Sequence, residues 1–379
     1  MDLLGAPRIA SCDPLAGRSV RPVESADEWN QQVLQLEGAL EQGYEWGEVL
    51  RRDGWTPHRY AVYADAACIA GVSIMARRLP GTPYSVLYAP RGPMWDGGHA
   101  MPWNEMGGAI RHLAASTRAI FLRLSPNALG TDSTVHQQLI AAGFRALDDD
   151  WTTWNAPRIV LRLDLKDTEH ELFRRIRKNT RSEIRAAAER GVIVRRDWNG
   201  DHLHHFHRML VETGRRKRYP IRSIRRLGAL WDEYVRRDHG VLLMAYRGDT
   251  PVGGVLGVRF GPQASFVYAA IRRDGDAARL DHGPLLYWEF IRWARDAGVT
   301  WIDWGGSGTR FPPSPEDAGY GVYHFKSNFG SRLHRLIGYY DLVFHPRLYR
   351  MFRTVEARLL PHAWGIRAKL NPMFGWRRR

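Results

Sequence analysis

The chain has 379 residues and carries 55 Lys and Arg against 40 Asp and Glu, a formal net charge of +15. Its apolar fraction of 44%, with 15 Trp, 15 Tyr and 13 Phe, can fill packed cores and excludes an intrinsically disordered chain. The length predicts two or three domains. The charge favours a polyanionic partner, although an arginine-rich surface that only keeps the protein soluble would show the same composition.

Two features of the sequence bear on its compartment. Cys12 and Cys68 form no CxxC or metal-binding spacing, which predicts a reducing compartment and no disulfide framework. The first residues, "MDLLGAPRIASCDPLAG", lack the basic and apolar regions of a signal peptide, and no apolar run is long enough to span a membrane. We therefore expect a cytoplasmic protein without a membrane span.

A weak internal repeat organises the chain. After a helix that is predicted to begin at Ser25, where "SADE" has the pattern of a capping box, "VYADAACIAGV" begins at Val62 and reads as strand, turn, strand. "AYRGDTPVGGV" begins at Ala245, and in both stretches a Tyr is followed eight positions later by a Gly. Each is followed by a similar strand ("SVLYA" and "SFVYA"), a helical segment and another strand. The shared order predicts two copies of one α/β unit.

The boundary between the two units is predicted near residues 150–157, where "DDDWTTWNAP" breaks the pattern. A second capping box, "TEHE" at Thr168, then opens one predicted helix that continues to a stop at Gly191. This helix carries many basic residues within a few turns: Arg174, Arg175, Arg177, Lys178, Arg181 and Arg185. It is typical either of phosphate-backbone binding or of a solvated surface face.

Two further motifs bear on cofactors. The histidines of "HLHHFHRML", which begins at His202, do not follow the ligand spacing of a zinc site, so we expect no metal. "RLDHGPLLYWEF" supplies only Gly283 where a pyrophosphate cradle needs several glycines, so a CoA-binding loop is poorly supported. We predict no cofactor.

Lys326 stands out because the chain has only five lysines. It lies between Phe325 and Phe329 in "GVYHFKSNFG", where aromatic walls would partly desolvate the ammonium and favour a matched anion or a developing oxyanion. The alternative is a lysine whose aliphatic stem packs on the rings. A second candidate segment, "YAPRGPMWD", places Arg91 and Asp96 around a Gly-Pro turn after a strand.

Four of these segments together resemble the Fem family of aminoacyl-tRNA-dependent transferases. They are "YAPRGPMWD", "RKNTRSEIRAAAERGV", "HGPLLYWEFIRWARDAGVTWIDWGG" and "GVYHFKSNFG", and the resemblance extends over about residues 46–349. It implies an α/β fold of two tandem acetyltransferase-like (GNAT) domains with mixed sheets. The first domain would comprise residues 1–155 completed by about 338–379, and the second residues 156–337.

Members of this family add amino acids to the stem peptides of peptidoglycan precursors. The resemblance implies that Lys326 and Phe325 take part in catalysis and that Asp96 is an acid near the acceptor peptide. Substrate contacts are expected from Arg91, Thr213, Arg215, Tyr219 and Tyr268, and tRNA contacts from Arg177, Lys178, Arg181 and Arg185. The chain departs from the family at Leu50, where relatives often have lysine.

The implied reaction is aminolysis: a free amine attacks the ester carbonyl of aminoacyl-tRNA, without metal or cofactor. The expected partners are aminoacyl-tRNA and a lipid-linked or UDP-linked peptidoglycan precursor. Three alternatives remain open at this point: a CoA-dependent N-acyltransferase, a related tRNA-dependent ligase of natural-product or exported-polymer assembly, and a non-enzymatic nucleic-acid-binding protein.

The C-terminal segment has two parts. Residues 347–360 read as a helix that packs on the first domain, with Leu348, Met351, Phe352, Val355 and Leu359 on one face. Residues 363–379 then interleave aromatic residues with arginines, a pattern that suits an anionic membrane surface. We therefore expect peripheral contact with the inner membrane face.

Overall fold

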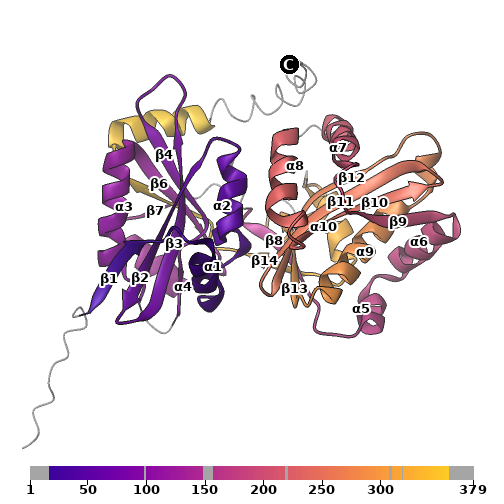
Figure 1. Ribbon diagram of the computed structural model, residues 1–379, viewed down its shortest axis with the longest axis horizontal. Coiled ribbons are helices and arrows are strands. Elements are labelled where there is room, and N and C mark those ends of the chain that lie inside the picture. Colours follow the sequence, from indigo (N-terminus) through magenta and orange to yellow (C-terminus); the bar gives the residue numbers. More distant parts are fainter. Residues whose placement is uncertain are drawn as a thin grey trace, which may run out of the picture.

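The computed structural model describes residues 17–97, 100–147, 157–217, 221–306, 310–317 and 319–357. They form two α/β units that lie side by side, the first at the left and the second at the right of Figure 1. Each unit is built on one mixed sheet with helices on both faces. The predicted α/β class with mixed sheets is confirmed.

The first sheet has the strand order β1-β2-β3-β4-β6-β15-β7, with β5 paired to β3 outside this path. Only β4 and β6 run parallel; the other neighbours are antiparallel. The strands are β1 (Arg18–Pro22), β2 (Thr56–Ala64), β3 (Ala67–Arg78), β4 (Ser85–Arg91), β5 (Met94–Trp95), β6 (Ala119–Pro126), β7 (Arg145–Leu147) and β15 (Tyr339–Val343).

The second sheet has the order β14-β8-β13-β12-β11-β10-β9, and here only β12 and β13 are parallel. In each sheet, the parallel pair therefore includes the strand that follows a long helix: β6 follows the helix at residues 103–117, and β13 follows the helix at residues 282–296. The strands are β8 (Ile159–Asp164), β9 (Val192–Asp197), β10 (Gly240–Arg247), β11 (Thr250–Phe260), β12 (Gln263–Ile271), β13 (Trp301–Gly306) and β14 (Arg332–Arg335).

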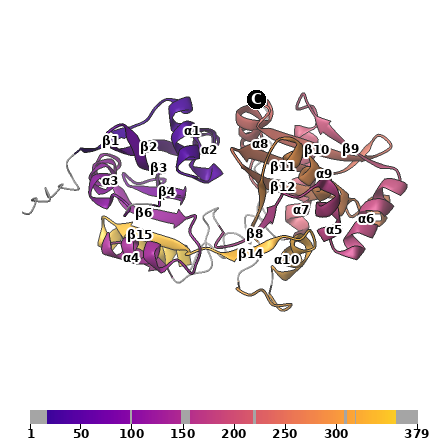
Figure 2. The same ribbon diagram turned by 90° about the horizontal axis from the view of Figure 1, so that it is seen from below.

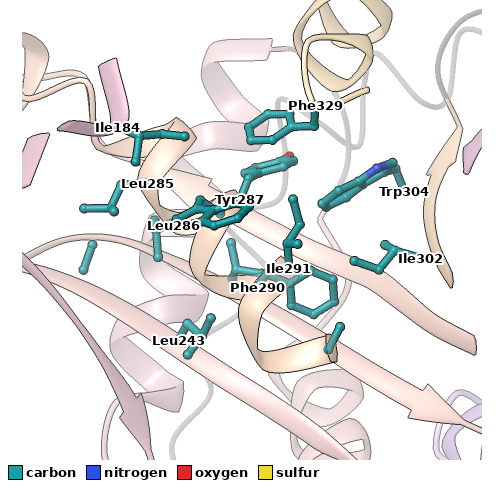
Figure 3. Close-up of a cluster of buried hydrophobic side chains, with 14 of the residues drawn as sticks. Ile184, Leu243, Leu285, Leu286, Tyr287, Phe290, Ile291, Ile302, Trp304 and Phe329 are labelled. Carbon is teal, nitrogen blue, oxygen red and sulfur yellow. The ribbon is translucent and has the colours of Figure 1, made fainter. Parts of the chain in front are cut away.

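Helices cover both faces of each sheet. In the first unit they are α1 (Ala26–Gln35), the 3₁₀ helix η1 (Leu40–Gln42), α2 (Tyr44–Arg51), α3 (Trp103–Thr117) and α4 (Ser133–Ala141). In the second they are α5 (Glu169–Arg175), α6 (Lys178–Glu189), α7 (Leu203–Lys217), α8 (Ile224–Leu230), the π-helical turn η2 (Trp231–Val235), the 3₁₀ helix η3 (Gly275–Arg279), α9 (His282–Asp296) and α10 (Tyr320–Ser327). Helix α9 contributes ten buried residues and is the centre of the second core, where Tyr287, Phe290 and Trp304 meet (Figure 3).

The sequence repeat corresponds to equivalent hairpins, β2–β3 and β10–β11. Each repeated tyrosine follows a register shift in its hairpin, between Val62 and Tyr63 and between Ala245 and Tyr246. The repeated glycines lie under a helix: a Cβ on Gly71 would meet Trp29 of α1, and one on Gly254 would meet Phe206 of α7. The pattern therefore marks a bulge and a close helix–sheet contact in both units.

The predicted single helix from Thr168 to Gly191 is wrong in one respect, because it is two helices. The capping box at Thr168 forms, but α5 ends at Arg175 and Ile176 is extended. The backbone N–H of Arg177 donates to the carbonyl of Asn328, a partner far along the chain, and Arg181 donates to the carbonyls of Arg174 and Ile176. A tertiary contact thus interrupts a pattern that is locally helical.

The C-terminal part of the described chain returns to the first unit. Strand β15 joins the first sheet, and the helix over residues 346–357, yellow in Figure 1, packs on the same unit. Glu356 and Asp341 both bind the guanidinium of Arg123, with nitrogen–oxygen distances of 2.7 Å, and all three side chains are buried. The packing face differs from the predicted one, since Met351 and Val355 are exposed.

Strand β15 thus belongs to the first sheet and β8 to β14 belong to the second, while the division into residues 1–155 with about 338–379, and 156–337, stays a prediction. The crossing from β14 to β15 is visible between the two units in Figure 2. The predicted boundary at residues 150–157 and the tail 363–379 lie mainly or wholly outside the described residues.

The two units share a hydrophobic core. Trp46, Val49 and Leu50 of α2 pack with residues of α7, α8 and β10–β12. Asp53 accepts a hydrogen bond from Arg226 across the interface at 2.6 Å. The interface therefore fixes the two units by apolar burial as well as by charge.

Candidate active site around Lys326

Lys326 lies on α10, whose neighbouring aromatic residues insert into the core of the second unit. Phe329 is buried, and Phe325 packs edge-on against Tyr287 with ring centroids 4.7 Å apart. Figure 3 shows Tyr287, Phe329 and Trp304 gathered at this end of the core. The aromatic packing anchors α10 and leaves Lys326 only 8% exposed, as the flanking phenylalanines predicted.

The Lys326 ammonium donates to two backbone carbonyls, that of Trp304 at 2.6 Å and that of Gly306 at 2.9 Å. Both belong to β13, which carries an extra residue relative to β8 between Asp303 and Gly306. Gly305 in this bulge has a φ of 73°, a left-handed conformation that favours glycine. In the part of the chain that the structure describes, the third N–H of Lys326 meets no protein acceptor.

Burial lowers the pKa of Lys326 to about 8, although the negative charge of Asp303 opposes this shift. Lys217, at the end of α7, adds to the lowering. A group with a pKa near the working pH can hold or release a proton at little cost. The site therefore offers a compact positive charge in a poorly hydrated position.

Arg91 and Asp96, the two candidates in the first unit, have different surroundings. Arg91 is buried at the end of β4 and its Nη2 donates to the carbonyl of Pro157 at 3.0 Å, across to the second unit. Its Nε lies 3.9 Å from the carboxylate of Glu41. Asp96 is exposed at the end of β5, and Lys326 is not among its described contacts. Their proposed roles toward substrate stay predictions.

The other predicted substrate contacts lie on α7 and β12. Thr213 is buried in α7, Arg215 is exposed in its last turn, and Tyr219 lies outside the described residues. Tyr268 faces the interface between the units, where burial raises the pKa of its phenol and Arg226, Arg222 and Asp53 are its charged neighbours. Helix α7 and Tyr268 thus flank the same inter-unit region.

The predicted tRNA contacts begin directly beside α10. Arg177 donates to Nε2 of His324, on α10, at 3.0 Å. Lys178 and Arg185 are exposed on α6. Arg181 differs, because its guanidinium donates to the end of α5 and supports the break between the two helices. The exposed basic residues at the start of α6 therefore lie next to α10, the helix that carries Lys326.

No group of three or more His, Cys, Asp or Glu side chains that could hold a metal occurs among the described residues. Gly283 is buried in the first turn of α9 between His282 and Pro284, and proline offers no N–H to an anion. No described helix combines the length and apolar character that crossing a bilayer requires.

Sequence reasoning missed the carbonyls of Trp304 and Gly306, which are as close to the ammonium as any side chain could be. The adjacent glycines in "WIDWGG" were the available signal, since glycine at a strand end often marks a bulge.

Comparison with known proteins decides the family. The model of the FemAB family matches residues 23–247, more than half of the chain. The chain belongs to the FemAB family. An acetyltransferase (GNAT) domain model also matches residues 174–327.

Relatives and solved structures agree with this assignment. The lipid II:glycine glycyltransferase of Staphylococcus aureus strain USA300 is 22% identical over 88% of this chain and 95% of its own length. The crystal structure of FemX superposes with a TM-score of 0.78 at 19% identity, covering 87% of this chain and 99% of that one. A tandem GNAT protein from the clavulanic acid biosynthesis pathway gives a TM-score of 0.52 at 12% identity, over 86% and 98% of the two chains. The tandem GNAT-like fold is confirmed, and this FemAB protein is an aminoacyltransferase.

Proposed function

We propose that this FemAB protein transfers an amino acid from aminoacyl-tRNA to an amine on the stem peptide of a peptidoglycan precursor. The observation that carries the proposal is the buried Lys326 ammonium, which is oriented by two carbonyls and has no third acceptor among the described residues. The acceptor class comes from the relatives, which are named for glycyl transfer to lipid II.

The reaction we infer is direct aminolysis. The acceptor amine attacks the ester carbonyl and a C–N bond forms. The C–O bond to the tRNA ribose then breaks, and the proton lost by the amine ends on the ribose oxygen, which leaves as a hydroxyl. The Lys326 N–H donates first to the tetrahedral oxyanion or to the departing ribose oxygen. A compact ammonium serves one such atom, whereas the planar fork of arginine would present several donors.

Burial supports this role in a second way. An activated ester is open to hydrolysis, which would waste the charged tRNA. The rings of Phe325, Tyr287 and Phe329 pack against one another where α10 meets the core, and they would limit the access of water to the site from that side. Phe325 therefore contributes by excluding water and by anchoring α10.

The basic surface supports tRNA as the donor. Arg177 joins the start of α6 to α10, so a phosphate backbone bound along the exposed faces of α5 and α6 would end near Lys326. We assign tRNA contacts to Arg177, Lys178 and Arg185. Arg181 supports this surface by holding the two helices together.

The inter-unit region is the proposed acceptor site. Arg91, Asp96, Thr213, Arg215 and Tyr268 come from both units. Tyr219 and the basic tail lie outside the described residues, and we keep them as proposed acceptor and membrane contacts. A lipid-linked acceptor would bring the protein to the inner membrane face, where the tail could bind anionic headgroups.

The donor is tested by offering the purified protein two labelled donors with one lipid-linked acceptor. We expect label transfer from aminoacyl-tRNA, its loss after ribonuclease treatment, and no transfer from acetyl-CoA. Lys326→Arg should lower the transfer rate about 100-fold, because the donor geometry of the site is lost. Transfer from acetyl-CoA alone would contradict the proposal. In a parallel reaction that offers small free amines as acceptors, transfer to these amines but not to the lipid-linked acceptor would favour a ligase with another acceptor.

A further inference from the structure

Lys326 is oriented by a backbone bulge, and one side chain holds that bulge. The Oδ1 atom of Asp303 accepts the backbone N–H of Gly305 at 2.6 Å, two residues along the same strand. This bond fixes the Trp304–Gly305 peptide, whose carbonyl is one of the two that receive the Lys326 ammonium. Asp303 itself is 7% exposed, so water competes poorly for its carboxylate.

The second oxygen of Asp303 faces Arg162 of β8, with Oδ2 and Nε 3.8 Å apart. Arg162 in turn donates to Oδ1 of Asn127, in the first unit, at 2.5 Å. The Asp303 carboxylate is thus held from two sides, by its own strand and by a guanidinium anchored across the interface. Burying a charge at this position is costly unless it is paired in this way.

Packing alone does not require an acid here. The position pairs with Arg162 in a β-ladder, and a neutral side chain would keep the strand pairing. The carboxylate adds two effects that an apolar residue would lack: it accepts the Gly305 N–H, and it places a negative charge near the Lys326 ammonium.

We propose that Asp303 is the positioning residue for Lys326, because its carboxylate holds the strand bulge whose two carbonyls orient the ammonium. The inference rests on the transfer reaction proposed above. Asp303 touches neither substrate in this account and acts only through Lys326.

Charged groups other than Asp303 also act on this cluster and will affect a titration of Lys326. Lys217 of α7 lowers the pKa of Lys326, whereas Asp303 raises it. The charges of Arg162 and Asp303 also act on His334 of β14, whose pKa is lowered mainly by burial. A change at Asp303 should therefore be compared with a change at a paired carboxylate far from this cluster.

The test uses two substitutions and a matched control. Asp303→Asn keeps an oxygen for the Gly305 N–H but removes the charge, and Asp303→Ala removes both. Asp238→Asn is the control, since Asp238 is an exposed carboxylate that also pairs with an arginine, Arg196, on the edge strand β9 and away from β13. Biosynthetic ¹³C-lysine labelling gives only five lysine side chains to follow, and Lys326→Met identifies the signal of interest.

We expect the titration midpoint of Lys326 to fall by about one pH unit in Asp303→Asn, because an opposite charge has been removed, and to stay unchanged in Asp238→Asn. The pH above which the transfer rate falls should decrease by the same amount as the titration midpoint of Lys326. Asp303→Ala should also lose about 100-fold in kcat with little change in KM, since the ammonium is no longer oriented.

The titration needs no substrate, so it separates two kinds of failure. An unchanged midpoint in Asp303→Asn, or an Asp303→Ala enzyme with the kcat of the parent, would overturn the positioning role. A parent protein that transfers nothing would overturn the proposed reaction, while the midpoint shift would still show that Asp303 controls the lysine. If Asp303→Ala fails to fold, Asp303→Asn decides the question alone.

Discussion

Lys326→Met is expected to abolish most transfer while leaving the protein folded. Methionine matches the length of the lysine stem and is flexible enough to fill the same buried position. Loss of a single donor to the developing oxyanion costs about 100- to 1000-fold in rate. A purely structural lysine would give a different result, because its removal would lower stability more than activity.

The stability effect can be worked out from the site. Burial lowers the pKa of Lys326 from an ordinary value of 10.5 to about 8, which corresponds to about 3 kcal/mol against the protonated form at neutral pH. Methionine removes that cost but leaves the carbonyls of Trp304 and Gly306 without a donor, at about 1 to 3 kcal/mol each. These contributions oppose each other, so we expect the change in the free energy of unfolding at pH 7 to lie between a gain of about 1 kcal/mol and a loss of about 3 kcal/mol.

The pH dependence gives a sharper result. The unfolded lysine binds its proton up to pH 10.5 and the folded one only up to about 8, so the unfolded state binds more protons between these values. The parent should therefore gain stability relative to Lys326→Met as pH rises through this window. Urea unfolding at several pH values measures the difference. A constant difference, or one of opposite sign, would refute the reasoning that the ammonium is desolvated in the folded protein.

Three further substitutions or truncations test other parts of the account. Charge reversal at Lys178 and Arg185 should weaken tRNA binding and flatten its salt dependence, measured by filter binding over a range of salt concentrations, because fewer counterions are released. Glu356→Gln should lower the free energy of unfolding by about 2 kcal/mol, because the buried Arg123 loses the charge of the Glu356 carboxylate. Deleting residues 363–379 should reduce binding to anionic vesicles and slow transfer to a lipid-linked acceptor, but spare a soluble nucleotide-linked one.

Each of these has a contradicting outcome. An unchanged salt slope would make α6 a solvated face. A Glu356→Gln variant with the same free energy of unfolding as the parent would show that the C-terminal helix is held by its apolar contacts alone. Glu24→Gln, at the exposed surface, serves as the control. Equal vesicle binding by the parent and truncated proteins would leave the tail without a membrane role.

The fold was largely predictable because the sequence patterns that indicate it are local and occur in both units. Tyr63 with Gly71 and Tyr246 with Gly254 mark the same bulge and helix contact twice, so one unit supports the interpretation of the other. The break after Arg175 was not predictable, since it depends on the carbonyl of Asn328, far along the chain. Helical periodicity describes a segment in isolation and cannot register such a partner.

The site was predictable only at its rarest residue. Lys326 could be found because lysine is scarce in this chain and phenylalanines flank it. Asp303 could not, because one aspartate in a strand is unremarkable until the bulge brings its carboxylate to Gly305. The outward position of Met351 was also hidden, because a helix with apolar residues on more than one side does not show which side meets the core.

The most direct test of the central claim is to incubate the purified protein with a mixture of charged tRNAs and a lipid-linked peptidoglycan precursor, and to weigh the precursor. We predict a mass increase equal to one or more amino-acid residues on the stem peptide, present with the parent and nearly absent with Lys326→Met. An unchanged precursor mass, with the charged tRNAs intact, would contradict the account.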